Sequence, residues 1–289
     1  SNINLDAIYL IVTYEIDTNT ESWSTGGYVG FPITLGGGTI QSVSITAEQG
    51  KVHLNTASQS LLRYLMEERG IASATANTLA ANIVNYRSGN YFDSLEELQQ
   101  VSGMTSAYYD LVKDYLTVYS FINSYAQRPA SGRAPININT ASREVLEAVF
   151  NSLSLGASDP ASLATDIINA RAIAPFTCFY SSNSSVTTDF YDFARGRSYL
   201  GTSGNPDEQD RVLDNADASS LVPVPGSTGY TALTTEFCYD VSSFKLESLA
   251  DINGRRYRIK TILGDDAAHT FTNYSGDASA SGWRRENFE

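Results

Sequence analysis

Apolar residues recur with the same spacing in two stretches of the chain. The residues Leu-Asn-Thr-Ala-Ser at 54–58 return as Ile-Asn-Thr-Ala-Ser at 138–142, an offset of 84 residues. Behind each copy, apolar residues occupy positions i, i+1, i+4 and i+5, which is one face of a helix. These positions are Leu61, Leu62, Leu65 and Met66 in the first copy, and Val145, Leu146, Val149 and Phe150 in the second. The pattern predicts one helical unit used twice.

The same offset relates more distant positions without a gap. Arg87 corresponds to Arg171, and Phe92 corresponds to Phe176, so the repeats span residues 55–92 and 139–176. A Ser or Thr before an apolar helical face is a preferred N-cap, and Glu or Gln three residues later completes a capping box. We therefore expect N-caps at Thr56, with Gln59 completing the box, and at Thr140, where Arg143 stands in the box position.

Alternating apolar residues predict strands on either side of the helical region. Residues 39–46 read as a strand, Glu48-Gln49-Gly50 reads as a turn, and 51–54 read as the answering strand of a hairpin. Near the other end, 237–249 and 255–263 flank Asn253-Gly254, a dipeptide that favours tight hairpin turns. The predicted fold class is α+β, with a sheet opened by the first hairpin and closed by the second.

The remaining segments complete the predicted organisation. Residues 3–17 carry a helical apolar stripe, whereas 177–236 are rich in Ser, Gly, Asp and Pro and show no periodicity. A loop of that length in a compact domain is normally functional or ordered by a ligand. We predict an N-terminal part at 1–54, an inserted helical domain at 55–176, the long acidic loop at 177–236, and a closing hairpin at 237–289.

Charge and composition narrow the classes of function. Of the 289 residues, 42% are hydrophobic, which favours a folded protein, and the net charge is −13. So acidic a surface repels phosphate backbones and anionic membranes. Two cysteines are too few for a disulfide scaffold, and no run of 18 apolar residues occurs in the chain.

Three segments in this order resemble one protein family. They are ITAEQGKVHLNTAS at 45–58, ININTASREVLEAV at 136–149 and FKLESLADINGRRYRIKTIL at 244–263. Together they resemble the K-type minor pseudopilins of type II secretion systems and the related large minor pilins of type IV pili. The resemblance implies a pilin-like antiparallel sheet, an N-terminal helix of which residues 3–17 are the remnant, and an inserted all-α domain of repeated helix-hairpin-helix or SAM-like units.

The resemblance also implies a function. Members of that family are non-enzymatic subunits that cap the tip of a periplasmic pseudopilus or pilus and help to initiate filament assembly. They assemble with smaller minor pseudopilins and reach the inner membrane only through a long apolar helix, which we expect to precede residue 3. We expect the 3–17 helix to contact these partners through Ile8, Ile11 and Val12.

Two further sites are candidates in and around the acidic loop. Some members of the family bind calcium, and oxygen ligands of the kind calcium prefers are supplied here by Asp207, Asp210, Asp214 and Asp217. An acidic solvated loop is the alternative interpretation. In the periplasm Cys178 and Cys238 could form a disulfide that closes a loop of 60 residues, worth on the order of 4 kcal/mol. Two separate buried cysteines are the alternative.

The alternative function is DNA binding or uptake of the competence type. Residues 70–87 and 102–115 resemble helix-hairpin-helix units, in which a Gly-apolar-Gly turn exposes backbone N–H groups to a phosphate. Here the second glycine is replaced by Ala72 in one hairpin and by Thr105 in the other, and neither turn has a basic cluster. No hydrolase, nucleotide or zinc-protease motif occurs, and His53 and His269 are isolated, so we expect no enzyme.

Overall fold

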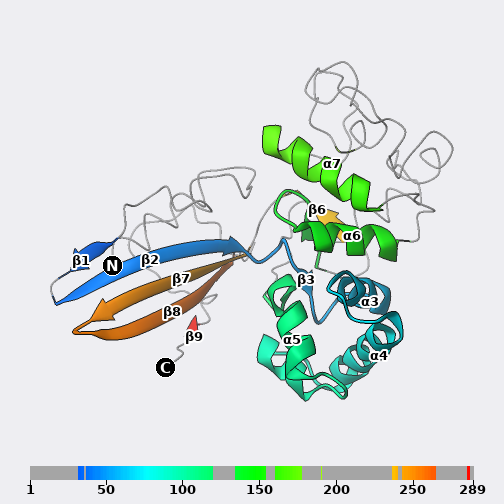
Figure 1. Ribbon diagram of the computed structural model, residues 1–289, viewed down its shortest axis with the longest axis horizontal. Coiled ribbons are helices and arrows are strands. Elements are labelled where there is room, and N and C mark those ends of the chain that lie inside the picture. The colour runs from blue at the N-terminus through cyan, green and yellow to red at the C-terminus, as the bar shows by residue number, and fades with distance from the viewer. Residues whose placement is uncertain are drawn as a thin grey trace.

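The computed structural model describes residues 32–35, 37–119, 134–153, 160–177, 190, 236–239, 243–264 and 285–286. In this part of the chain a twisted sheet extends to one side of a group of helices (Figure 1). The helix predicted at 3–17 and most of the predicted acidic loop lie outside the described residues. No helix among the described residues combines the length and the apolar character needed to cross a bilayer.

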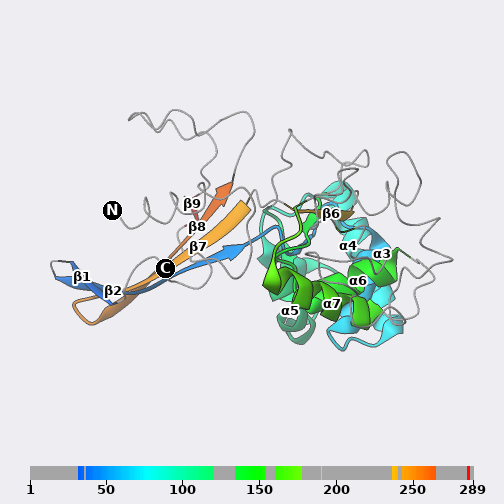
Figure 2. The same ribbon diagram turned by 90° about the horizontal axis from the view of Figure 1, so that it is seen from above.

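The sheet is antiparallel and brings together strands from the two ends of the chain. Its order is β1 (Ile33–Leu35), β2 (Gly38–Ala47), β7 (Ser243–Ile252), β8 (Arg255–Gly264) and β9 (Arg285–Glu286). The β2–β7 register runs from Gly38 opposite Ile252 to Ala47 opposite Phe244. All the described helices lie between these two strands in sequence, as Figures 1 and 2 show. The α+β class is therefore confirmed.

The predicted closing hairpin is present. Asn253 (φ 56°) and Gly254 (φ 77°) are both left-handed, as a two-residue turn of this hand requires, and they join β7 to β8 in register. The strand predicted at 237–249 is divided, however. Its first part is the short strand β6 (Phe237–Cys238), which pairs away from this sheet with β5 (Ile136–Asn137).

The predicted 39–54 hairpin is wrong. β2 confirms the strand at 39–46, but its neighbours in the sheet are β1 and β7. The answering strand is only β3 (Val52–His53), which pairs in parallel with β4 (Leu116–Thr117). The reason is that the turn after β2 redirects the chain into the helical part, while the side of β2 opposite β1 is occupied by a strand from the distant end of the sequence.

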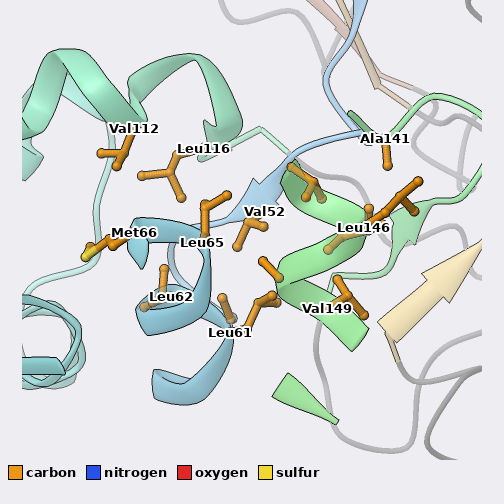
Figure 3. Packing of buried hydrophobic residues seen from close by; sticks show 14 of the residues in the cluster. Val52, Leu61, Leu62, Leu65, Met66, Val112, Leu116, Ala141, Leu146 and Val149 are labelled. Atoms are coloured by element: carbon orange, nitrogen blue, oxygen red, sulfur yellow. The ribbon is translucent and has the colours of Figure 1, made fainter. Parts of the chain in front are cut away.

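The helical part contains two pairs of longer helices. The first pair is α3 (Gln59–Glu68) and α4 (Ser73–Gly89), and the second is α6 (Arg143–Ser152) and α7 (Pro160–Ile173). Between the pairs lie η1 (Leu95–Gln100), α5 (Ser106–Val112) and η2 (Lys113–Tyr115). α3 packs against α6, its equivalent in the other repeat. Figure 3 shows Leu61 and Leu65 of α3 facing the helix that carries Leu146 and Val149.

The predicted N-caps are wrong by two residues. The side chains of Ser58 and Ser142 accept hydrogen bonds from the backbone N–H of Leu61 (3.1 Å) and Val145 (3.3 Å), so they are the caps. The box expected between Thr56 and Gln59 does not form, because residues 53–57 make a turn before the helix begins. In that turn the N–H groups of Thr56 and Ala57 both donate to the carbonyl of His53.

Candidate functional site at the junction of the sheet and the repeats

Each helical repeat is closed by one asparagine. Asn55 Nδ2 donates to the carbonyl of Phe92, and the Phe92 N–H donates back to Asn55 Oδ1, both at 2.9 Å. Asn139 makes the same pair of bonds to Phe176, at 3.0 and 2.8 Å. All four residues are buried, and each asparagine fixes both backbone groups of a residue 37 positions away. The 84-residue repeat in sequence is therefore a repeat in structure.

One arginine in each repeat holds the turn before the first helix. Arg87 donates to the carbonyls of Leu54 (2.8 Å) and Ala57 (2.6 Å), and Arg171 donates to the equivalent carbonyls of Ile138 and Ala141, both at 2.6 Å. Burial lowers the pKa of Arg171 to about 10, which leaves the guanidinium charged at neutral pH. The planar guanidinium has several N–H donors in a fixed arrangement, so it can bind two neighbouring backbone carbonyls at once. The offset aligned these arginines, but their role as clamps became visible only in the structure.

A two-residue parallel ladder precedes each repeat. β3, just before the first repeat, pairs with β4, and β5, just before the second repeat, pairs with β6. Beside the ladders, the Leu54 N–H donates to the Thr117 carbonyl (2.8 Å) and the Ile138 N–H donates to the Cys238 carbonyl (2.9 Å). The partner strand of β5 is therefore β6, which follows residues 178–235 in the sequence. Cys238 is buried there, while Cys178 lies outside the described residues, so the disulfide stays a prediction.

The turn at 48–51 is the junction between the sheet and both repeats. Glu48 in this turn is only 3% exposed. Its carboxylate forms an ion pair with Lys51 Nζ at 2.7 Å and accepts a hydrogen bond from the hydroxyl of Thr117 at 2.6 Å. The Glu48 N–H donates to the Ser243 carbonyl (2.9 Å) at the start of β7. Glu48 therefore ties β7 and β4 to the turn that leads into β3. Of these partners, the sequence pattern indicated only the turn itself.

The junction also contacts the second repeat. The Asn137 N–H donates to the Gln49 carbonyl at 2.8 Å. A Cβ atom added at Gly50 would lie 2.8 Å from the carbonyl oxygen of Thr140, closer than a carbon atom can approach without displacing backbone. Glycine at this position therefore allows the turn to touch the second repeat directly. The buried turn therefore joins the sheet to the helical part, at the end of β2 that points toward the helices in Figure 2.

The interface between α3 and α6 contains an acidic group with a perturbed pKa. Burial, followed by hydrogen bonding to Glu147, raises the pKa of Glu68 to about 7. Asn151 Nδ2 donates to Glu68 Oε1 at 3.2 Å, and Arg143 pairs with Glu147 at 2.5 Å. A neutral Glu68 can share a proton with Glu147, which removes the repulsion between two carboxylates at this interface.

The first hairpin has the geometry of a helix-hairpin-helix turn but not its charge. Gly70 is left-handed (φ 84°), and the N–H groups of Gly70 and Ile71 donate to the carbonyls of Glu67 and Met66, which is a Schellman end to α3. At the start of α4, the hydroxyl of Ser73 donates to Glu67 Oε1 at 2.6 Å. A carboxylate therefore lies where a phosphate would approach, and it disfavours an anion there.

Several predicted site residues lie outside the described part of the chain. They are Ile8, Ile11, Val12, Asp207, Asp210, Asp214 and Asp217. Among the described residues no group of three His, Cys, Asp or Glu side chains is arranged to hold a metal ion. His53 is buried in β3, where its ring nitrogens contact the hydroxyl of Thr56 and the carbonyl of Val118, both at 3.1 Å.

Comparison with known proteins gives two results. Residues 47–117 match a family model described as the helix-hairpin-helix motif, which covers the first repeat and the segment that follows it. The fold is similar to that of a chain in the crystal structure of the GspK–GspI–GspJ complex from the enterotoxigenic Escherichia coli type 2 secretion system. The TM-score is 0.54, identity is 15%, and the match covers 92% of this chain and 89% of that chain. No curated protein sequence matches the chain.

Proposed function

We propose that this chain is a non-enzymatic minor pseudopilin that caps the tip of a type II secretion pseudopilus or a type IV pilus. The observation that carries the proposal is the pairing of β2 with β7, which makes one sheet from the two ends of the chain and leaves the repeats as an insertion. The similarity to a chain of the GspK–GspI–GspJ complex supports it, because that likeness extends over 92% of this chain and thus includes both parts.

The shape of the molecule supports a position at the tip. The repeats are anchored to the end of the sheet through the buried Glu48 junction, so they cannot easily move away from it. In the wall of a filament, the helical repeats would obstruct the next subunit. At the tip no further subunit follows on one side, so there is room for the repeats. In this proposal residues 1–54 and 237–289 form the pilin-like part, 55–176 form the inserted helix-hairpin-helix or SAM-like domain, and 177–236 form the loop.

The proposed partners are smaller minor pseudopilins, and the proposed location is the periplasmic side of the inner membrane or the pilus tip. Ile8, Ile11 and Val12 would contact the partners' helices. To test this, the double variant Ile8→Asp with Val12→Asp is co-expressed with the small pilin-like proteins of the same organism. We expect the complex to be lost on affinity purification.

A matched control carries the same added charge elsewhere. Tyr91 and Ile173 are 64% and 75% exposed on the helical part, so the double variant Tyr91→Asp with Ile173→Asp should retain the partners. Recovery of the Ile8 and Val12 double variant with its partners at the wild-type yield would refute the proposed contact. Equal loss in both double variants would assign the effect to added charge rather than to the helix.

Calcium and the disulfide belong to the same proposal. Calcium held by Asp207, Asp210, Asp214 and Asp217 would order the loop, and we expect a chelator to lower the melting temperature. The quadruple Asp→Asn variant should have the lower melting temperature without chelator. A melting temperature that is indifferent to chelator would contradict calcium binding. Mass spectrometry of peptides from the unreduced protein would establish whether Cys178 is joined to Cys238.

The helix-hairpin-helix match at 47–117 favours a second candidate, DNA binding. The contact between Ser73 and Glu67 argues against it, as does the net charge of −13. Gel-shift titration with duplex DNA at low salt distinguishes the two functions. Binding that weakens steeply with salt and is lost in a Gly70→Val variant would favour DNA binding and displace the tip proposal.

A further inference from the structure

The chain has only four lysines, and all four line one pocket. Lys51, Lys113, Lys245 and Lys260 are the only lysines in the 289 residues, and each belongs to the wall of a pocket of about 390 Å³ between the sheet and the segment that follows the first repeat. Fifteen residues line this pocket, so a random distribution of lysines would place few or none there. The volume falls within the range of ligand pockets.

The four lysines come from three parts of the chain that only the fold brings together. Lys51 follows the Glu48 junction, Lys113 begins η2, and Lys245 and Lys260 come from β7 and β8. Arg258, on the same strand as Lys260, adds a fifth cationic side chain. The register pairs Glu247 with Lys260 and Leu249 with Arg258, two residues apart along β8, so both cationic side chains lie on one face of the sheet.

Some of this positive charge is already neutralised. Lys51 pairs with Glu48 at 2.7 Å, Lys113 pairs with Asp110 at 2.6 Å, and Arg258 pairs with Glu247 at 3.2 Å. Lys260 also has an interaction partner, whereas Lys245 is half-buried and has no carboxylate within ion-pair distance in the described part of the chain. Burial, with the nearby charge of Lys51, lowers the pKa of Lys245. An unpaired, half-buried cation is costly unless an anion meets it.

The rest of the pocket wall determines what kind of anion fits. Five cationic side chains and three carboxylates (Glu48, Glu96 and Asp114) give the pocket a net charge of about +2, while the whole chain carries −13, which leaves −15 for the remainder. A long polyanion or an anionic bilayer would meet the negative net charge of the whole chain as well as this local positive field, and the net charge disfavours both. A short group with single negative charges would meet only the local positive field.

Apolar and aromatic residues line the same pocket. Leu95, Tyr109, Tyr119, Val118 and Ile262 supply surface on which an aliphatic or aromatic side chain can pack. Carboxylates already in the wall disfavour a compact dianion such as phosphate more than a single carboxylate. We propose that this pocket binds carboxylate groups of an acidic peptide segment of a partner protein, with Lys245 as the cation that meets them. The inference does not depend on the tip role.

The four lysines allow the pocket to be observed directly. Reductive methylation with ¹³C-formaldehyde labels every lysine and preserves its charge, so all the labelled side chains apart from the N-terminal amine report on this pocket. The probe is a short peptide of alternating glutamate and phenylalanine, blocked at both ends. We expect the Lys245 methyl signal to shift on titration and the pKa of Lys245 to rise. The glutamine version of the peptide should cause no shift.

Additional arms identify the source of the carboxylate. A glutamine–phenylalanine peptide with a free C-terminus tests for a chain end, and inorganic phosphate tests for a compact dianion. Binding of the free C-terminus alone would overturn the acidic segment as the ligand and assign the site to a chain end. Phosphate that binds as tightly as the acidic peptide would overturn the choice of ligand, and absence of any methyl shift with both carboxylate probes would overturn the site.

A pair of variants separates the pocket from general charge. Lys245→Met should weaken binding of the acidic peptide by about tenfold, or roughly 1.4 kcal/mol, since it removes one direct charge contact. Arg256→Met removes the same charge from an exposed position on β8 outside the pocket and should change the affinity less than twofold. Circular dichroism confirms that both variants fold. Equal weakening by both variants would refute a specific role for Lys245.

Discussion

The arginine clamps make a quantitative prediction about stability. In each repeat one guanidinium donates two hydrogen bonds to backbone carbonyls, Arg87 in the first and Arg171 in the second. Two hydrogen bonds from a charged donor are together worth about 3–6 kcal/mol. Removing the guanidinium also removes the cost of burying it, which is visible in the lowered pKa of Arg171. We therefore expect Arg87→Met and Arg171→Met each to lose about 2–4 kcal/mol.

Urea unfolding followed by circular dichroism measures this loss. The midpoint should fall while the slope with denaturant stays constant, because the surface exposed on unfolding is unchanged. Arg63→Met is the control, since Arg63 lies over the Tyr64 ring at 4.2 Å and pairs with Glu67 within α3 but binds no backbone carbonyl in the described structure; such an ion pair is worth about 0.3–0.5 kcal/mol. Arg87→Lys should recover only part of the loss, because an ammonium lacks the fork that reaches both carbonyls. If both arginine variants lose less than the Arg63 control, the clamp does not stabilise the fold.

Three more predictions follow from the junction and its surroundings. Gly50→Ala should destabilise the protein in urea unfolding because its Cβ would lie 2.8 Å from the Thr140 carbonyl, whereas Gly89→Ala, with no atom within 4 Å, should be neutral or slightly stabilising; equal effects would disprove the close contact. Burial lowers the pKa of His53 to about 4, so the protein should lose stability as pH falls from 6.5 towards 4. Asn137 occupies the equivalent position before the second repeat, and His53→Asn should abolish this pH dependence of the melting temperature. The pKa of Glu68 is raised from 4.5 to about 7, so stability should fall as pH rises through that interval, by about 1 kcal/mol after allowing for the partial exposure of Glu68. Glu68→Gln should remove this decline. A variant with the same pH profile as the wild type would show that Glu68 titrates normally.

Elements that depend on local pattern could be predicted from the sequence. The 84-residue repeat predicts two copies of one helical unit, because the spacing of apolar residues along the chain indicates which of them share a helix face. The Asn253–Gly254 turn predicted its hairpin, because left-handed backbone is restricted to few residue types. The predicted N-cap of the first repeat is misplaced because the two candidates, Thr56 and Ser58, cannot be ranked without the turn that precedes the helix.

The contacts between residues far apart in the sequence could be identified only from the fold. Nothing local to β2 indicates that its neighbour is β7 rather than the segment just after it, since any strand of matching pattern satisfies the same backbone groups. The lysine pocket cannot be recognised in the sequence for the same reason: its four lysines are separated by up to 209 positions and come together only when β7, β8 and the segment after the first repeat fold around the Glu48 junction. Spacing along the chain encodes helices and turns, whereas a pocket arises from packing between elements, and that packing is a property of the whole fold.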